Sequence, residues 1–299
     1  MVATAIEGGV NFIDTADGYA NGQSELCVGR ALKDLNIERS DIVICSKGGM
    51  RMRPGPNGDG ASRAYLMQAC ENSLKRLGTD YIDLYMVHVF DPVTPLEETL
   101  RALDDLQRAG KVRYVGCSNF AGWELMKALD ISKYEGLARF EVVESHWSIA
   151  TRDMERDIVP LARSEGIGIM AWGALLGGVL TGKYRRDGSS DQAGRRGGAI
   201  PAGLNRDKIH DIVDTMRDIA DAHGVTPAEI ALAFLLRENV TSSVIFGSTK
   251  PEQVQANLKA SGLALSSDEI ERLEAISAPT WDYFTQGLLR MRAARQLPG

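Results

Sequence analysis

The chain has 299 residues, of which 44% are hydrophobic and 25% are charged, and its formal net charge at pH 7 is -6. This composition allows a full buried core in one large α/β domain, and the negative charge argues against nucleic acid or an anionic membrane as the main partner. No apolar run reaches membrane-spanning length and the start does not resemble a secretory signal, so we expect a cytoplasmic protein without a membrane anchor.

Strand-like and helix-like segments alternate along the chain. The first residues, Met1 to Gly9, are typical of the last turns of a helix closed by glycine. Amphipathic helices then separate seven expected strands, which span Val10–Ala16, Ile42–Lys47, Ile82–His88, Val112–Ser118, Phe140–Trp147, Ile167–Leu175 and Ser243–Gly247. This alternation predicts a parallel sheet, either closed or doubly wound. No GxGxxG motif follows a strand and opens a helix, which weighs against a Rossmann domain.

The number of expected strands limits the architecture. A (β/α)8 barrel has eight strands, and this chain begins on a helix end with no strand before it. We therefore expect either an open sheet or a barrel that lacks its first βα unit. No linker divides the chain, so residues 1–299 are predicted to form a single domain.

Two segments depart from the regular pattern. The glycine-rich stretch 184–204 is too long for a plain connection, and its composition predicts a mobile lid or a loop that orders on binding. The tail 278–299 has a weaker pattern, and it offers Trp281, Tyr283 and Phe284 for packing against a pocket. The four cysteines lie inside expected helices or strands, and their spacing does not indicate a metal site.

Four polar residues stand at or just after the ends of the first three strands: Asp14, Tyr19, Lys47 and His88. Parallel α/β proteins keep their chemistry at this edge of the sheet. A lysine ammonium stabilises a nearby phenolate, so Tyr19 is suited to exchange a proton with a carbonyl or an alcohol. Taken singly, Asp14 also fits a helix cap, Lys47 a solvated strand end and His88 a core histidine.

The motifs around these residues resemble the aldo-keto reductases. The resemblance rests on NFIDTADGYANGQSE, ICSKGG, the run from YIDLYMVHVF to VGCSNF, HWSIATRDMERDIVP, AWGALLGGVLTGKY and SSVIFGSTKPEQVQANL. They occur in the family's order and spacing from about Ala3 to Ile276. The W-S-x-x-x-R-D-x-E-R run and AWGAL are most similar to the branch of aryl-alcohol dehydrogenase-like reductases.

The resemblance implies a (β/α)8 barrel that binds an extended NADP(H) across its C-terminal rim without a Rossmann fold. It implies that Tyr19 donates the proton, that Lys47 and Asp14 tune it, and that His88 orients the carbonyl. Family members also carry a first strand and most of a first helix before the segment that opens here. We favour a shortened start over a stable seven-stranded enzyme as the interpretation of this difference.

The same resemblance implies the cofactor site. Ser118 and Asn119 would hold the nicotinamide carboxamide, and Trp172 would stack under the ring. The remaining residues that the resemblance places on the cofactor are Glu144, Gly173, Leu175, Gly178, Gly247, Ser248, Thr249, Lys250, Gln253 and Asn257.

Two of these positions depart from the family pattern. Glu144 stands where glutamine is common, and a carboxylate cannot donate a hydrogen bond to the carboxamide unless it is protonated. Gln253 stands where many members have arginine, so the planar fork for the 2′-phosphate is lost. Lys250 offers positive charge instead, which keeps NADPH favoured.

These observations predict an NADP-dependent oxidoreductase that reduces aldehydes or ketones, including aromatic ones, to alcohols. The partner is a small-molecule carbonyl or alcohol, no metal is required, and a homo-oligomer is compatible with the sequence. Two alternatives are a non-catalytic nicotinamide-binding regulatory subunit, as in the β-subunits of potassium channels, and an inactive shortened relative. The GGVLTGK run matches a P-loop pattern, but Tyr184 follows it in place of the hydroxyl residue that binds Mg²⁺, so NTPase activity is not predicted.

Overall fold

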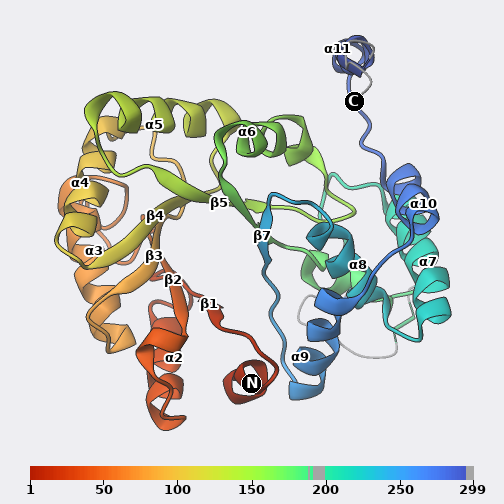
Figure 1. Cartoon of the computed structure of the whole chain (residues 1–299), viewed down its shortest axis with the longest axis horizontal. Helices are drawn as coiled ribbons and strands as arrows, with labels where there is room; N and C mark the ends of the chain where they lie inside the picture. The colour runs from red at the N-terminus through yellow and green to blue at the C-terminus, as the bar shows by residue number, and fades with distance from the viewer. Residues whose placement is uncertain (188, 191–198, 294–299) are drawn as a thin grey trace.

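The computed structural model describes residues 1–187, 189–190 and 199–293. Seven parallel strands form one sheet whose spatial order is their order in the chain. Figure 1 shows this sheet curling, with helices along its outer side. The strands are β1 (Phe12–Asp14), β2 (Val43–Gly48), β3 (Ile82–Val87), β4 (Val112–Ser118), β5 (Phe140–His146), β6 (Gly168–Trp172) and β7 (Thr241–Val244).

Helices make the connections between the strands. They are α1 (Val2–Glu7), α2 (Gln23–Asp34), α3 (Arg63–Leu77), α4 (Leu96–Arg108), α5 (Gly122–Glu135), α6 (Ile158–Glu165), α7 (Arg206–His223), α8 (Pro227–Leu236), α9 (Pro251–Leu258), α10 (Ser267–Ser277) and α11 (Tyr283–Ala293). Short 3₁₀ helices occur at η1 (Arg39–Asp41), η2 (Asp153–Arg156), η3 (Leu176–Thr181) and η4 (Lys259–Gly262). Local chemistry sets several of the ends: the Ser62 hydroxyl accepts from the Tyr65 amide to start α3, and left-handed Gly78 ends it.

The predicted seven-stranded parallel sheet is confirmed, and the largest differences are at its two edges. The first strand is confined to Phe12–Asp14, and the last begins at Thr241 and ends at Val244. Each edge strand has a single neighbour, β2 or β6, so its length is set by how far that one pairing extends. After the Ile245 amide donates to Ala171, the chain leaves the sheet.

Side chains alternate between the two faces of the sheet, and this alternation separates two cores. The outer face packs against the helices in the main hydrophobic core. The inner face carries a smaller apolar cluster made of Phe12, Cys45, Leu84, Met86, Val142, Met170 and Ile245. Two residues further along β1, β2, β3, β5 and β6, the same inner face reaches the C-terminal edge. The positions there are Asp14, Lys47, His88, Glu144 and Trp172.

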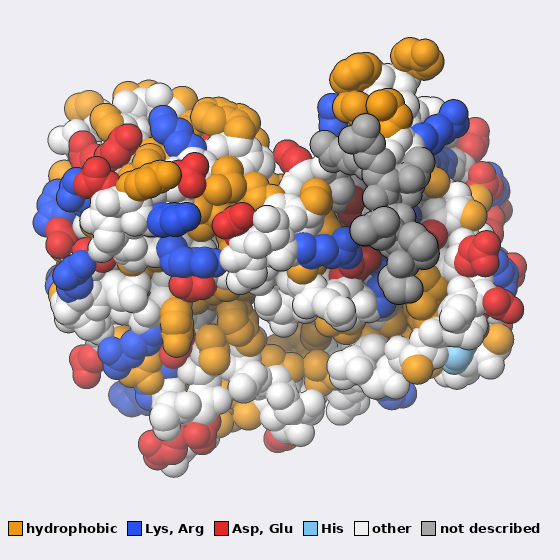
Figure 2. All heavy atoms as spheres, turned by 45° about the horizontal axis from the view of Figure 1, so that its top comes forward, with side chains coloured by type: hydrophobic (Ala, Val, Ile, Leu, Met, Phe, Trp, Pro, Cys, Tyr) orange, Lys and Arg blue, Asp and Glu red, His pale blue; other side chains and the backbone are white. Residues whose placement is uncertain are grey.

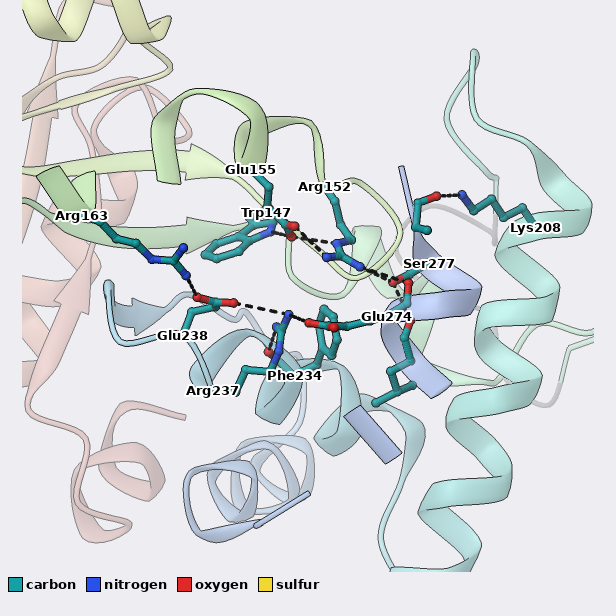
Figure 3. Close-up of polar contacts among 12 residues, drawn as sticks. Trp147, Arg152, Glu155, Arg163, Lys208, Phe234, Arg237, Glu238, Glu274 and Ser277 are labelled. Atoms are coloured by element: carbon teal, nitrogen blue, oxygen red, sulfur yellow. Dashed lines mark hydrogen bonds and ion pairs between the residues drawn. The ribbon is translucent and has the colours of Figure 1, made fainter. Parts of the chain in front are cut away.

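The W-S-x-x-x-R-D-x-E-R run stabilises the barrel wall (Figure 3). The Trp147 indole N–H donates to Glu155 Oε1 at 3.1 Å. Arg152 donates to both carboxylate oxygens of Glu155, at 2.8 and 2.7 Å, and to the Ser277 hydroxyl at 2.9 Å. The run therefore ties the end of β5 and η2 to α10, which is a structural role for the motif.

The tail does not pack as the sequence suggested. It forms α11, which stands away from the rest of the molecule in Figure 1, and Figure 2 shows hydrophobic side chains gathered on it. Tyr283 and Phe284 are 93% and 69% exposed, so the expectation that they pack against a pocket is wrong. The Asp282 side chain caps α11 and pairs with Arg156, and these polar contacts hold the helix while its aromatic residues face outward. Residues 188 and 191–198 of the expected lid at 184–204 lie outside the described part of the chain.

Within the described ranges no single helix is long and apolar enough to cross a membrane, and only α7 and α8 counted together meet the criteria, with a bend of 97° between them. All of the residues from Ala228 to Leu235 in α8 are buried within the protein.

The sheet is open between β1 and β7. The described residues show pairing of β1 with β2 and of β7 with β6, and none between the two edges. A cavity of about 450 Å³ lies there, lined largely by apolar side chains of α1, β1, β7, α8 and α9. The described residues thus form a curled seven-stranded parallel sheet, whereas a closed (β/α)8 barrel has eight strands.

An added strand is expected to stabilise this open edge. We predict that extending the chain before Met1 with the strand and helix of an eight-stranded relative raises the melting temperature, because the new strand pairs both edges and covers the apolar lining. Each kcal/mol gained corresponds to about 2 °C or slightly less in a chain of this size. Thermal unfolding and light scattering measure the gain and the monomer fraction. The matched control carries prolines in the added strand; the same melting temperature with and without those prolines would contradict the prediction.

Candidate active site

Tyr19 lies on the connection from β1 to α2. Ala20, Asn21 and Gly22 follow it with φ of 49°, 55° and 81°, a run of left-handed residues that turns the chain sharply into the helix. Such conformations are uncommon outside glycine and often occur at functional sites. The Tyr19 side chain remains 37% exposed, while its hydroxyl lies 3.3 Å from the Lys47 ammonium. The loop thus leaves one face of the ring accessible and points its reactive atom at a cation.

Lys47 is fully buried, and its ammonium is surrounded by oxygen atoms. Asp14 Oδ1 lies at 2.5 Å, Glu144 Oε2 at 3.1 Å and the Thr15 carbonyl at 3.2 Å. Burial lowers the pKa of the ammonium, but Asp14 and the other nearby groups that carry negative charge when ionised outweigh it, so the pKa lies above its usual range. Lys47 is therefore a permanent cation.

The pKa of Tyr19 is raised. Burial is the largest cause, Lys47 opposes it, and the carboxylates of Asp14 and Glu144 add to it. Tyr19 is therefore a phenol with a proton to give at neutral pH, and the adjacent ammonium stabilises the phenolate that remains afterwards.

His88 follows β3 and packs against Tyr19, with ring centroids 5.5 Å apart and planes at 80°. Burial, followed by the charge of Lys47, lowers its pKa to about 4, so the ring is neutral at neutral pH. A neutral imidazole has one N–H donor and one acceptor. His88 can therefore donate a hydrogen bond to a carbonyl oxygen placed beside Tyr19. The structure brings all four predicted catalytic residues together.

Asn119 links three strand ends beside this group. Its Nδ2 donates to the Ser118 hydroxyl at 2.9 Å and to the His88 carbonyl at 3.0 Å, and its Oδ1 accepts from the Trp172 indole at 3.0 Å. Trp172 also packs edge-on against His146 with centroids 4.5 Å apart, and it remains 36% exposed. The indole is thus held firmly with surface left over for stacking on a planar ring, which fits a nicotinamide.

The rim residues predicted to hold the rest of a nucleotide form two further groups. Gly173 and Gly178, on either side of Leu175, have left-handed φ of 75° and 95°. A Cβ on Gly173 would lie 2.5 Å from the His146 ring, so glycine is required there. Because neither glycine has a side chain, a nucleotide can approach the backbone at both positions near the start of η3.

The last group surrounds the start of α9, after Gly247. Asn257 Nδ2 donates to the Ser248 hydroxyl at 3.4 Å, and the Thr249 amide donates to Gln253 Oε1 at 3.0 Å. Lys250 is exposed at the first turn, so its ammonium is accessible to an anion at this helix N-terminus. Ser248 and Asn257 line the cavity at the open edge of the sheet together with Asp14.

Glu144 lies within the catalytic group. Its carboxylate is buried beside Lys47, and the pairing of β4 with β5 places it opposite Ser118, while its contact with a carboxamide stays a prediction. Burial, followed by the charge of Asp14, raises its pKa to about 8. Its inward position, two residues after Val142, follows from the alternation of side chains along β5, but its approach to Lys47 depends on how far the sheet curls.

Two other buried acids were missed. Glu25 accepts from the Ser46 hydroxyl at 2.5 Å and pairs with Arg76 at 2.6 Å. Asp17 is 1% exposed, and neither carboxylate oxygen has a hydrogen-bond partner among the residues described. Burial, followed by the charge of Glu25, raises the pKa of Asp17 to about 7.

Comparison with known proteins adds independent information. The model of the aldo/keto reductase family matches residues 1–278. A probable voltage-gated potassium channel subunit beta of Arabidopsis thaliana is 36% identical over 270 residues, covering 84% of this chain and 78% of the relative. An aldo-keto reductase of Fusarium vanettenii is 32% identical over 304 residues, covering 93% and 81%. A norsolorinic acid reductase of Emericella nidulans is 34% identical over 274 residues, covering 90% and 68%.

The buried Asp17 makes stability depend on pH. Its pKa in the folded chain, about 7, exceeds the ordinary value of 3.8, so its contribution is fully present below the ordinary value and is lost as pH rises toward 7. We predict that at pH 8 the free energy of unfolding of Asp17→Asn exceeds that of the wild type by on the order of 3 kcal/mol, and that most of this difference is lost at low pH.

Urea unfolding at both pH values measures the difference. Asp34→Asn, at an exposed position on α2, is the control and should show no pH-dependent change. An Asp17→Asn advantage that is the same at both pH values would show that the pKa of Asp17 is not raised in the folded chain.

Proposed function

The chain belongs to the aldo/keto reductase family of oxidoreductases, and on this premise we propose that it reduces aldehydes and ketones to alcohols with NADPH. The observation that carries the proposal is the approach of the Tyr19 hydroxyl to the Lys47 ammonium, at 3.3 Å, with Asp14 2.5 Å from that ammonium. A proton donor, a cation that stabilises its conjugate base and a counter-ion provide the proton transfer that accompanies carbonyl reduction. The proposed location is the cytosol.

Each residue has a distinct task in the proposed reaction. When bound, a reduced nicotinamide supplies a hydride to the carbonyl carbon. His88 donates a hydrogen bond to the carbonyl oxygen and polarises it. Tyr19 gives its proton to that oxygen as negative charge develops there, and Lys47 stabilises the phenolate. Asp14 fixes the ammonium, and the reverse transfer oxidises an alcohol.

The cofactor would be held by residues that the fold already arranges. Ser118 and Asn119 offer a hydroxyl and an amide to the carboxamide, and Trp172 offers an aromatic face to the ring. The backbone at Gly178 fits a pyrophosphate, and Ser248, Lys250 and Asn257 would bind the 2′-phosphate. The partly exposed ring of Tyr19 favours aromatic carbonyl compounds as substrates, because a flat ring packs well against it.

A second candidate is a regulatory subunit that binds the nicotinamide without turnover. It is favoured by the identity of 36% to a protein named as a potassium channel subunit beta. Incubation with NADPH and an aromatic aldehyde separates the two candidates. Loss of cofactor absorbance together with alcohol formation supports the reductase, whereas cofactor binding without turnover supports the regulatory subunit.

We predict that Tyr19→Phe lowers the reduction rate by about a hundred- to ten-thousandfold, because it removes the proton donor and keeps the ring. NADPH affinity should be nearly unchanged, which fluorescence titration measures alongside the rate. Tyr134→Phe, at a position 83% exposed on α5, is the matched control and should behave as the wild type. A Tyr19→Phe variant that retains more than half of the wild-type rate would rule out this role.

The cofactor preference provides a separate prediction. Lys250→Ala should weaken NADPH binding more than NADH binding, because only NADPH carries the 2′-phosphate. Gln253→Arg should tighten NADPH selectively by adding a bidentate donor. Dissociation constants for both cofactors measure the effects, with Lys259→Ala, an exposed lysine on η4, as the control. Equal losses for NADPH and NADH in Lys250→Ala would show that Lys250 does not face the phosphate.

A further inference from the structure

Two carboxyl groups lie beside the Lys47 ammonium, although one carboxylate is enough to neutralise its charge. Asp14 reaches it from β1 and Glu144 reaches it from β5, on the far side of the curled sheet. Glu144 is 2% exposed, and its Oε2 lies at ion-pair distance from Lys47 without a hydrogen bond to any described residue. A fully ionised carboxylate in that position would be poorly compensated.

The charges around Glu144 can be counted. The titratable groups that face it are Asp14 on β1, Cys45 and Lys47 on β2, and Tyr19 on the loop after β1. Burial raises the pKa of the Cys45 thiol, so it stays neutral, and Tyr19 is a phenol at neutral pH. With Asp14 ionised, Lys47 is already neutralised. An ionised Glu144 would therefore leave the buried cluster with one net negative charge.

The position of Glu144 also limits what it can do. A carboxylate oxygen of Glu144, a carboxylate oxygen of Asp14 and the Sγ atom of Cys45 lie within 4.8 Å of one another, so the Glu144 carboxyl group is directed into the cluster. Its backbone carbonyl accepts from the Asn119 amide at 2.9 Å, which fixes β5 against the residue that bridges the strand ends. The side chain is therefore held beside Lys47 by the sheet itself.

We propose that Glu144 is a positioning residue that holds a proton while Tyr19 acts as the acid, and that its ionisation weakens Tyr19 as a proton donor through Lys47. When Glu144 is neutral, Lys47 has one counter-ion and can stabilise the Tyr19 phenolate. When Glu144 is ionised, the phenolate becomes a third negative group around one ammonium, so it forms less readily. The pKa of Glu144, about 8, places this change just above neutral pH.

The inference rests on the proposed function and deepens it. In the reduction, the O–H bond of Tyr19 breaks, its proton passes to the substrate oxygen, and the electron pair stays on the phenolate oxygen. Glu144 exchanges no atom with the substrate. Its ionisation changes only the amount of negative charge beside the Lys47 ammonium.

The test measures the ionisation of Tyr19 directly. Wild type, Glu144→Gln and Glu144→Asp are each titrated by ultraviolet difference absorbance, with the corresponding Tyr19→Phe chain as the blank for the other tyrosines. We expect Glu144→Gln to lower the pKa of Tyr19 by about one unit, since it removes a like charge. Glu144→Asp should remain close to the wild type because it restores that charge. The same Tyr19 pKa in wild type and Glu144→Gln would overturn the proposal.

A second measurement does not depend on a variant. Carbon-13 label in the glutamate carboxyl groups of the wild-type chain reports their protonation by NMR. Because aspartate is not labelled, Asp17, whose pKa is also near neutral, does not contribute a signal. One buried glutamate that loses its proton near pH 8 is expected. Glutamates that are all ionised by pH 6 would overturn the proposal even if Glu144→Gln failed to fold.

Reduction of an aromatic aldehyde by NADPH is then followed against pH. We expect the wild-type rate to fall as pH rises through 8, and the Glu144→Gln rate to show no such step. If Glu144→Gln lowers the pKa of Tyr19 but neither the variant nor the wild type reduces the aldehyde, the result would support the role of Glu144 and refute the proposed function. Turnover with no Tyr19 shift would refute the role of Glu144 and leave the function standing.

Discussion

The buried ammonium of Lys47 is the constraint on which the site depends. Removing a lysine charge from water costs several kcal/mol unless anionic and polar partners replace the solvent. Asp14 on β1, the Thr15 carbonyl and Glu144 on β5 supply those partners, so the strands must approach one another at this edge of the sheet. The curl of the sheet brings Asp14 and Glu144 to this one cation, and Tyr19 lies beside it. Burial, followed by the charge of this cation, lowers the pKa of His88 and keeps it neutral, and the cation stabilises the phenolate of Tyr19.

Strand geometry connects this site to the fold. Because side chains repeat on one face every two residues, a strand can place an apolar residue in the inner core and a polar residue at the rim. Cys45 and Lys47 on β2 show this division, as do Met86 and His88 at the end of β3. The apolar residues of the inner core thus determine how far along the strands the polar residues of the site lie. Asn119 then fixes the neighbouring strand ends against one another, which holds the layer in one arrangement.

Much of this arrangement could be predicted from the sequence, since it follows from local patterns. The alternation of strand-like and helix-like segments predicted the parallel sheet, and the polar residues after the first three strands predicted the catalytic group. The direction of the Glu144 carboxyl could not be predicted, because it depends on how far the sheet curls to bring β5 toward β2. Asp17 was missed because its burial comes from packing by distant elements. The exposure of Tyr283 was missed because composition alone does not reveal whether an aromatic residue finds a surface to cover.

The most direct test of the account is hydride transfer itself. The wild-type chain is incubated with an aromatic aldehyde and NADPH carrying deuterium at C4 of the nicotinamide, and the alcohol is examined by mass spectrometry. The account predicts one deuterium on the carbinol carbon and almost no product from Lys47→Met, which keeps the apolar stem and removes the charge. Tight binding of the cofactor with no labelled alcohol from the wild-type chain would contradict it.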